Sequence, residues 1–75
     1  MSLAQHLEFQ LDPGRDHVEL NQLLKLCGLA DSGARGKHLV ASGAVTVDGQ
    51  VELRKTCKIR SGQRVRLGEV EISVL

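Results

Sequence analysis

Aromatic side chains are almost missing from this sequence, which contains one Phe and neither Tyr nor Trp. Proteins that recognise single-stranded bases usually stack those bases on aromatic rings. This chain cannot build such a platform from rings, although the planes of its arginines could stack. A nucleic-acid ligand would therefore be recognised through its phosphates and its shape, as proteins do on structured RNA.

Cysteine is also scarce, and histidine falls at no metal-ligand spacing. Cys27 and Cys57 are too few and too far apart for a metal site with paired ligands. We interpret them as two buried small hydrophobic residues, while a single disulfide between them stays open. We interpret His6, His17 and His38 as surface or cap-adjacent residues. The sequence therefore predicts neither a metal nor a cofactor.

Long apolar runs are absent as well. No stretch approaches the roughly 18 consecutive apolar residues of a membrane span, and residues 1–10 lack the features of a secretory signal. We expect a cytoplasmic protein that does not bind membranes, with one small domain in its 75 residues. The sequence contains no G-x-S-x-G elbow, no G-x-x-x-x-G-K-[ST] loop and no H-E-x-x-H pair. We therefore predict no enzymatic activity and no catalytic residue.

Positive charge is present but unevenly distributed, although the formal net charge is only +1. Residues 1–31 sum to −3 and residues 32–66 to +6, and two glutamates in the last nine residues restore the balance. A positive segment on a nearly neutral protein indicates an anionic partner. Chance clustering of surface charges is the alternative.

A strand and then a helix are predicted in the first third of the chain. Polar and apolar residues alternate over residues 6–11, and this terminal strand can form only by pairing with an edge elsewhere. A helix is expected at about residues 17–27, with Asp16 as its N-cap and Glu19 completing a capping box. Gly28 ends it. The apolar stripe of this helix consists of Leu20, Leu23, Leu24 and Cys27.

A second helix is expected from Ser32 to Ser42, capped by Asp31 or Ser32 and ended by the glycine that follows. Its interior is weak, because Gly33 and Gly36 each cost about 1 kcal/mol relative to alanine. Close packing against the first helix would offset that cost, and close approach of the backbone to a ligand is the alternative.

The remainder of the chain indicates strands. Residues 45–47 and 50–51 flank Asp48-Gly49, a dipeptide that suits a two-residue hairpin turn. Residues 53–60 form a basic stretch that we interpret as irregular.

A final hairpin is predicted from residues 64–67 and 70–74, with Gly68-Glu69 as its turn. In this register Arg66 faces Glu71 and is neutralised by it, whereas Arg64 faces a serine and stays available. The expected fold is α+β: a two-helix motif packed on a small, curved, mostly antiparallel sheet, with the N-terminal strand joining the sheet.

The order of these segments resembles the S-four-like RNA-binding domain, which is named after a small-subunit ribosomal protein and contains the helical αL motif. The resemblance covers residues 18–67 and is closest to short stand-alone bacterial members. It implies binding to structured RNA, typically ribosomal or transfer RNA, and an association with the ribosome. The matching segments are LLKLCGL at 23–29, SGARGK at 32–37, SGAVTVDGQV at 42–51 and KIRSGQRV at 58–65.

The chain departs from the family at two basic positions. Many members carry an arginine where this chain has Glu19, and consecutive arginines where it has Gly33-Ala34. We therefore expect binding to rely on the basic loop and sheet, with phosphate contacts also from the second helix. The predicted contacts are Lys37, Arg54, Lys55, Lys58 and Arg60, with Arg35 and Arg64 as secondary candidates.

The competing hypothesis is a protein-interaction adaptor. A basic face could dock on an acidic protein, and the N-terminal strand could pair with the edge of a partner's sheet. We expect a monomer under either hypothesis. A preference for structured RNA over an acidic polypeptide would distinguish the two.

Overall fold

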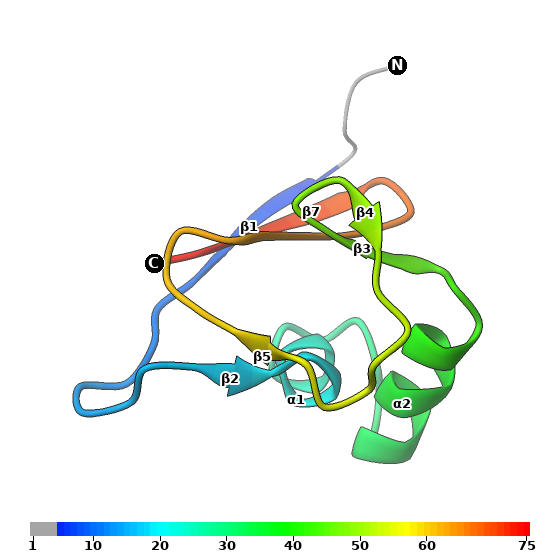
Figure 1. Cartoon of the computed structure of the whole chain (residues 1–75), viewed down its shortest axis with the longest axis horizontal. Helices are drawn as coiled ribbons and strands as arrows, with labels where there is room; N and C mark the ends of the chain where they lie inside the picture. The colour runs from blue at the N-terminus through cyan, green and yellow to red at the C-terminus, as the bar shows by residue number, and fades with distance from the viewer. Residues whose placement is uncertain (1–4) are drawn as a thin grey trace.

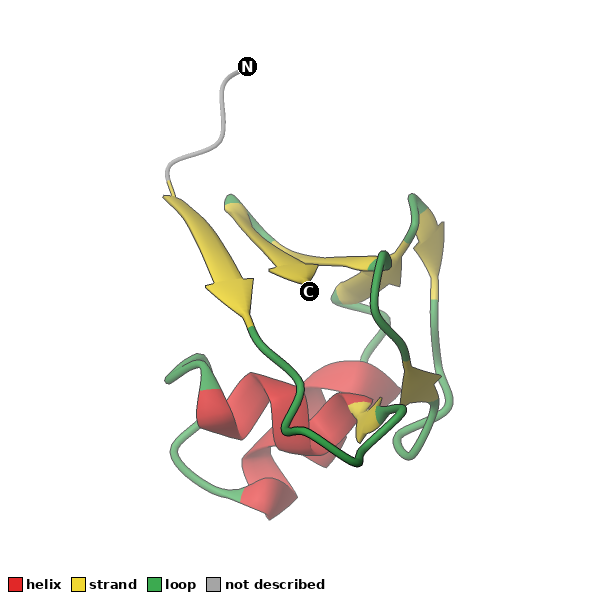
Figure 2. Cartoon of the chain, turned by 90° about the vertical axis from the view of Figure 1, so that its left-hand side faces the viewer, coloured by secondary structure: helices red, strands yellow, loops and turns green. Residues whose placement is uncertain are grey.

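Two helices lie on one side of a five-stranded mixed sheet, in a computed structural model that describes residues 5–75 (Figures 1 and 2). Residues 1–4, which the predicted domain includes, lie outside the described residues. The sheet order is β1-β7-β6-β3-β4, and a separate two-stranded sheet joins β2 to β5. This arrangement confirms the predicted fold class. The elements are β1 Gln5–Phe9, β2 Val18–Glu19, α1 Leu20–Leu26, α2 Gly33–Ala41, β3 Val45–Val47, β4 Gln50–Val51, β5 Lys58–Ile59, β6 Arg64–Leu67 and β7 Val70–Val74.

The N-terminal strand finds its partner at the other end of the chain. β1 pairs in parallel with β7, which places Leu7 opposite Ile72 and Phe9 opposite Val74. Leu7 and Phe9 pack against the core, whereas Glu8 between them is exposed. The alternating pattern therefore reflects one face turned toward the helices, and the predicted strand is confirmed.

The C-terminal hairpin has the predicted register. Leu67 pairs with Val70 and Arg66 with Glu71, and all other pairs follow from the two-residue turn. Arg66 Nη2 lies 3.8 Å from Glu71 Oε2, so the predicted neutralisation is also confirmed. At the other hairpin, Asp48 has a φ of 52°, in the left-handed region that its turn requires.

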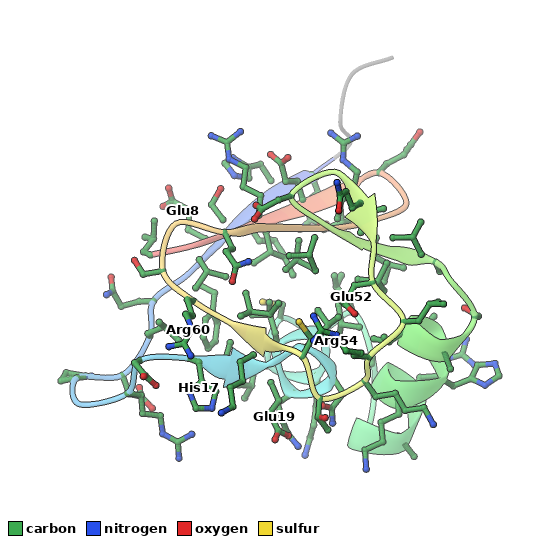
Figure 3. The ribbon with its side chains drawn as sticks, in the orientation of Figure 1. Glu8, His17, Glu19, Glu52, Arg54 and Arg60 are labelled. Atoms are coloured by element: carbon green, nitrogen blue, oxygen red, sulfur yellow. The ribbon has the colours of Figure 1, made fainter. Side chains whose placement is uncertain are left out.

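The first helix begins later than predicted, and its predicted cap is wrong. α1 starts at Leu20, because Val18 pairs with Ile59 and extends the chain just before the helix. Asp16 instead contacts the side chains of His17 and Arg60, which are labelled in Figure 3. Its carboxylate is 2.7 Å from His17 Nδ1 and accepts a hydrogen bond from Arg60 at 3.1 Å. The residue at the N-cap is Glu19, whose side chain makes no capping hydrogen bond.

The second helix forms as predicted, with Ser32 as its cap. Ser32 Oγ accepts a hydrogen bond from the backbone N–H of Arg35 at 3.1 Å. The two glycines near its start are not equivalent. A Cβ added to Gly36 would lie 2.6 Å from the backbone oxygen of Asn21, whereas one at Gly33 would meet only the end of a glutamine side chain at 3.8 Å. Close packing of the two helices is therefore the explanation for Gly36.

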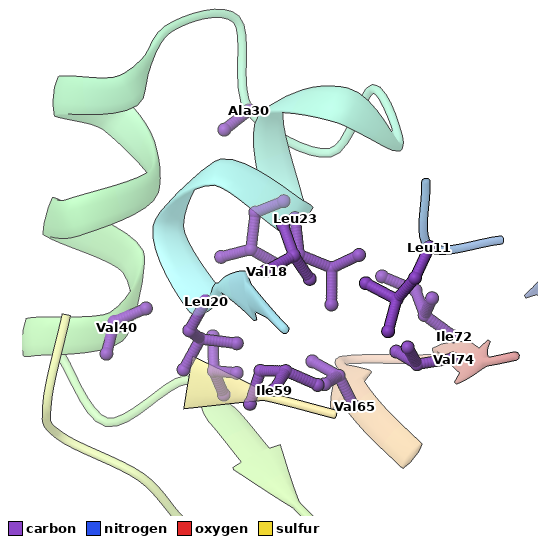
Figure 4. Packing of buried hydrophobic residues seen from close by; sticks show 12 residues of the cluster. Leu11, Val18, Leu20, Leu23, Ala30, Val40, Ile59, Val65, Ile72 and Val74 are labelled. Carbon is purple, nitrogen blue, oxygen red and sulfur yellow. The ribbon is translucent and has the colours of Figure 1, made fainter. Parts of the chain in front are cut away.

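The hydrophobic core fills the space between the helices and the large sheet (Figure 4). Both cysteines are free thiols that pack against this core, but they are only partly buried and not fully buried as predicted. None of the helices in residues 5–75 is long and apolar enough to cross a bilayer. The core consists of Leu11, Val18, Leu20, Leu23, Leu24, Ala30, Val40, Val45, Ile59, Val65, Ile72 and Val74.

Candidate nucleic-acid interface

Several of the predicted contacts meet around one depression on the surface. Residues 52–57 connect β4 to β5. We call residues 53–57 of this connection the basic loop, and the hollow beside it the basic depression. Within residues 5–75, no acidic side chain is among those that line this depression. The depression is lined by Lys37, Leu53, Arg54, Lys55, Thr56, Cys57 and Lys58.

Backbone hydrogen bonds fasten the basic loop to the start of α1. The N–H of Leu20 donates to the carbonyl of Cys57 at 2.9 Å, and the N–H of Asn21 donates to the carbonyl of Lys55 at 3.1 Å. The loop therefore satisfies two of the amide groups that a helix leaves free at its N-terminus. This is the role that the sequence had assigned to Asp16.

Lys37 reaches the same depression from a different element. It follows Gly36 on α2, and Gly36 is the point of close contact with α1. The helix packing thus places Lys37 beside a loop that is fastened to α1. In this way Lys37 comes to the same depression as Lys55 and Lys58, which lie close together later in the sequence.

These lysines are exposed, and none of them forms an ion pair with another side chain within residues 5–75. Within the described part of the chain, the ion pairs of lysine and arginine involve Arg54, Arg60 and Arg66 only. A cluster of unpaired lysines repels itself, and an anion placed among them relieves that repulsion. Lysine ammonium groups serve as mobile point charges for phosphate.

Arg54 lies at the basic depression but is held by an acidic neighbour. Its Nε donates to Glu52 Oε2 at 3.0 Å, its Nη2 donates to Oε1 at 3.2 Å, and its backbone N–H donates to Oε2 at 3.0 Å (Figure 3). The thiol of Cys57 is 3.6 Å from Oε1. Hydrogen bonds from the Arg54 side chain, and then from its backbone, lower the pKa of Glu52 from 4.5 to about 2.

We expect the carboxyl of Glu52 to titrate with a midpoint near pH 2. Because its pKa is lower in the folded protein than in the unfolded chain, the pair stabilises the loop above pH 4.5. That stabilisation is lost as the pH falls from 4.5 through about 2. Carbon-detected NMR titration of the side-chain carboxyl measures this midpoint. Arg54→Ala should return it toward the ordinary value, and a wild-type midpoint in the ordinary range would contradict the geometry.

The other predicted contacts lie elsewhere. Arg60 does not line the basic depression and pairs with Asp16, whose pKa is lowered by the hydrogen bonds from His17 and then Arg60. Both members of this pair are more than half exposed, so the pair contributes little to stability. Arg35 is exposed on α2, outside the depression.

Arg64 lies on the outer face of the large sheet. It lines a separate hollow there with Thr46, Arg66 and Glu71. The neighbouring Val65 faces the core, and alternation along β6 turns Arg64 to the opposite side. The structure therefore brings Lys37, Arg54, Lys55 and Lys58 together and separates Arg60, Arg35 and Arg64 from them.

Sequence reasoning missed the part that Glu52 plays in this surface. An acidic residue two positions before an arginine, in an otherwise basic stretch, is a weak signal of a local pair. It also missed Leu53, which is 59% exposed and lines the depression. No pattern in the sequence distinguishes an exposed leucine from a core leucine at that position.

Comparisons with known proteins identify the family of this chain. The sequence model of the S4 domain matches residues 10–75. This chain belongs to the S4 domain family. The resemblance drawn from its motifs is therefore confirmed, and the match extends beyond residues 18–67 at both ends.

Two bacterial members of the S4 domain family are similar in sequence. The chain is 51% identical over 59 residues to the "Putative RNA-binding protein YbcJ" of Escherichia coli K12, covering 79% of this chain and 84% of YbcJ. The same values hold for YbcJ of Shigella flexneri. The solution structure of E. coli YbcJ is similar in fold, with a TM-score of 0.70 and 47% identity over 91% of this chain and 85% of that one. That structure is described as revealing an αL motif involved in RNA binding.

Proposed function

We propose that this S4 domain protein is a binding module for structured RNA. The observation that carries the proposal is the convergence of Lys37, Lys55 and Lys58 around a depression without an acidic lining residue among residues 5–75. The involvement of E. coli YbcJ in RNA binding, as its structure is described, supports the proposal. Phosphate neutralisation by lysines releases counterions, so binding is expected to weaken steeply with salt.

We further propose that the bound RNA is ribosomal or transfer RNA, recognised through phosphates and shape, in the cytoplasm and in association with the ribosome. The only aromatic residue in the sequence, Phe9, packs partly buried against the core. The sequence contains no Tyr or Trp, so the described surface offers no platform of large aromatic rings on which unpaired bases could stack. The charged loop is hydrogen-bonded to a packed helix pair, which suits the defined arrangement of phosphates that a folded RNA presents.

RNA that co-purifies with the tagged protein from its native cells tests the proposal. Ribosomal or transfer RNA should be enriched with the wild type and lost with the triple variant Lys37→Ala, Lys55→Ala and Lys58→Ala. Circular dichroism should show that the variant is folded, because all three side chains are exposed. Absence of RNA from both samples would contradict RNA binding and favour a protein-interaction adaptor.

A further inference from the structure

One carboxylate joins the two ends of the basic loop. Glu52 receives hydrogen bonds from Arg54, which begins the turn, and from the thiol of Cys57, which ends it. The side chain of Glu52 is 18% exposed, whereas that of its partner Arg54 is 76% exposed. The carboxylate is therefore largely shielded from solvent, and it lines a second hollow that Arg54, Cys57 and Lys58 also border.

The backbone on either side of the carboxylate is also fixed. The N–H of Glu52 donates to the carbonyl of Val45 at 3.0 Å, which ties the loop to β3. Within the loop, the N–H of Cys57 donates to the carbonyl of Arg54 at 3.2 Å, and the Cys57 carbonyl accepts from α1. Glu52 thus binds the side chains of Arg54 and Cys57 at the point where the chain passes from the large sheet to the helices.

A carboxylate at this position opposes the attraction of phosphate to the loop. Its charge reduces the positive potential around Lys55 and Lys58, and it binds Nε and Nη2 of the Arg54 guanidinium. An acidic residue that only neutralised charge would weaken RNA binding. Its geometry instead matches a role in shaping the loop.

We propose that Glu52 is a positioning residue, which orders the basic loop for RNA and keeps Arg54 out of the phosphate contacts. The contacts are then made by Lys37, Lys55 and Lys58. This inference rests on the proposed function. It also reassigns Arg54, which the sequence had indicated as a contact, to the support of the loop.

The test uses substitutions for which a charge effect of Glu52 and a positioning effect of Glu52 predict opposite changes in RNA affinity. Glu52→Gln removes one negative charge from the binding face, and with it the carboxylate that holds Arg54. Arg54→Lys keeps the charge but removes the fork that binds a carboxylate in two places. Glu19→Gln is the matched control: Glu19 pairs across the strands with Lys58, is exposed, and forms no side-chain hydrogen bond or ion pair within residues 5–75.

Affinities are measured for two probes, bulk folded transfer RNA and polyuridylic acid, in the same buffer. Glu52→Gln and Arg54→Lys should each weaken transfer RNA binding roughly threefold to tenfold, and the double variant should be no weaker than either, because the residues act as one unit. Glu19→Gln should bind transfer RNA as well as the wild type or more tightly. Flexible polyuridylic acid responds mainly to charge, so both glutamine variants should bind it at least as well as the wild type.

Tighter transfer RNA binding by Glu52→Gln, equal to that of Glu19→Gln, would overturn the inference and leave the proposed function standing. Unchanged binding by Arg54→Lys would also overturn it. A wild type that binds neither probe would contradict the proposed function itself. If Glu52→Gln fails to fold, Arg54→Lys decides, since it changes an exposed side chain and no charge.

Discussion

Gly36→Ala is expected to lower the free energy of unfolding by about 1–3 kcal/mol, despite the better helix propensity of alanine. The added Cβ would lie 2.6 Å from the backbone oxygen of Asn21, and only backbone movement could relieve that contact. Asn21 cannot move easily, because its N–H is bound to the basic loop and its side chain is 1% exposed. Urea denaturation measures the loss, and the thermal midpoint should fall by about 4–8 °C per kcal/mol.

Gly33→Ala is the matched control on the same helix. Its Cβ would meet only the flexible end of Gln22 at 3.8 Å, so alanine should be neutral or stabilising by up to about 1 kcal/mol. Changes of opposite sign in the free energy of unfolding would establish that α2 requires glycine at position 36 because of its contact with α1. A Gly36→Ala protein as stable as the wild type would show that α1 and α2 separate at little cost.

The double variant Lys55→Ala and Lys58→Ala is expected to bind structured RNA roughly tenfold more weakly, with a flatter dependence on salt. Each lost phosphate contact should reduce the magnitude of the log–log salt slope by about 0.7 to 0.9. Both lysines line the basic depression and are exposed, so the fold should be unaffected. Affinity for transfer RNA measured over a series of salt concentrations gives both quantities.

The control for this variant removes the same charge elsewhere. Arg15→Ala with Lys25→Ala also lowers the net charge by two, at exposed positions outside the basic depression. It should leave the salt slope nearly unchanged. Equal slopes for the two double variants would mean that binding responds to net charge alone, and would remove the basic loop from the site.

Local sequence patterns were sufficient to predict most helices and strands of this fold. The two-residue turn at Gly68-Glu69 set the register of the last hairpin, because each further pair follows by counting outward from the turn. Ser32 and the following apolar positions likewise predicted α2 correctly. Such features depend on residues close together in the chain, and their physical chemistry is local.

The start of α1 was predicted wrongly because two local preferences were outweighed by a distant partner. Asp16 and Glu19 suit a helix N-terminus, but Val18 is buried and pairs with Ile59, far along the chain. That pairing keeps residues 18–19 extended, and carbonyls of the basic loop accept the amides of Leu20 and Asn21 at the later helix start. The same pairing makes β5 a strand within a stretch interpreted as irregular.

The sequence by itself determined the α+β class, the family and the concentration of positive charge in residues 32–66, because composition, turns and motif order need no contact information. Only the tertiary structure decided which cations share a surface. Lys37 joins Lys55 and Lys58 because α2 packs on α1 at Gly36, while Arg64 is turned to the far side of the sheet. The net charge of a segment follows from its composition alone. A binding site also requires side chains that point to the same surface, and packing and hydrogen bonds between distant segments set those orientations.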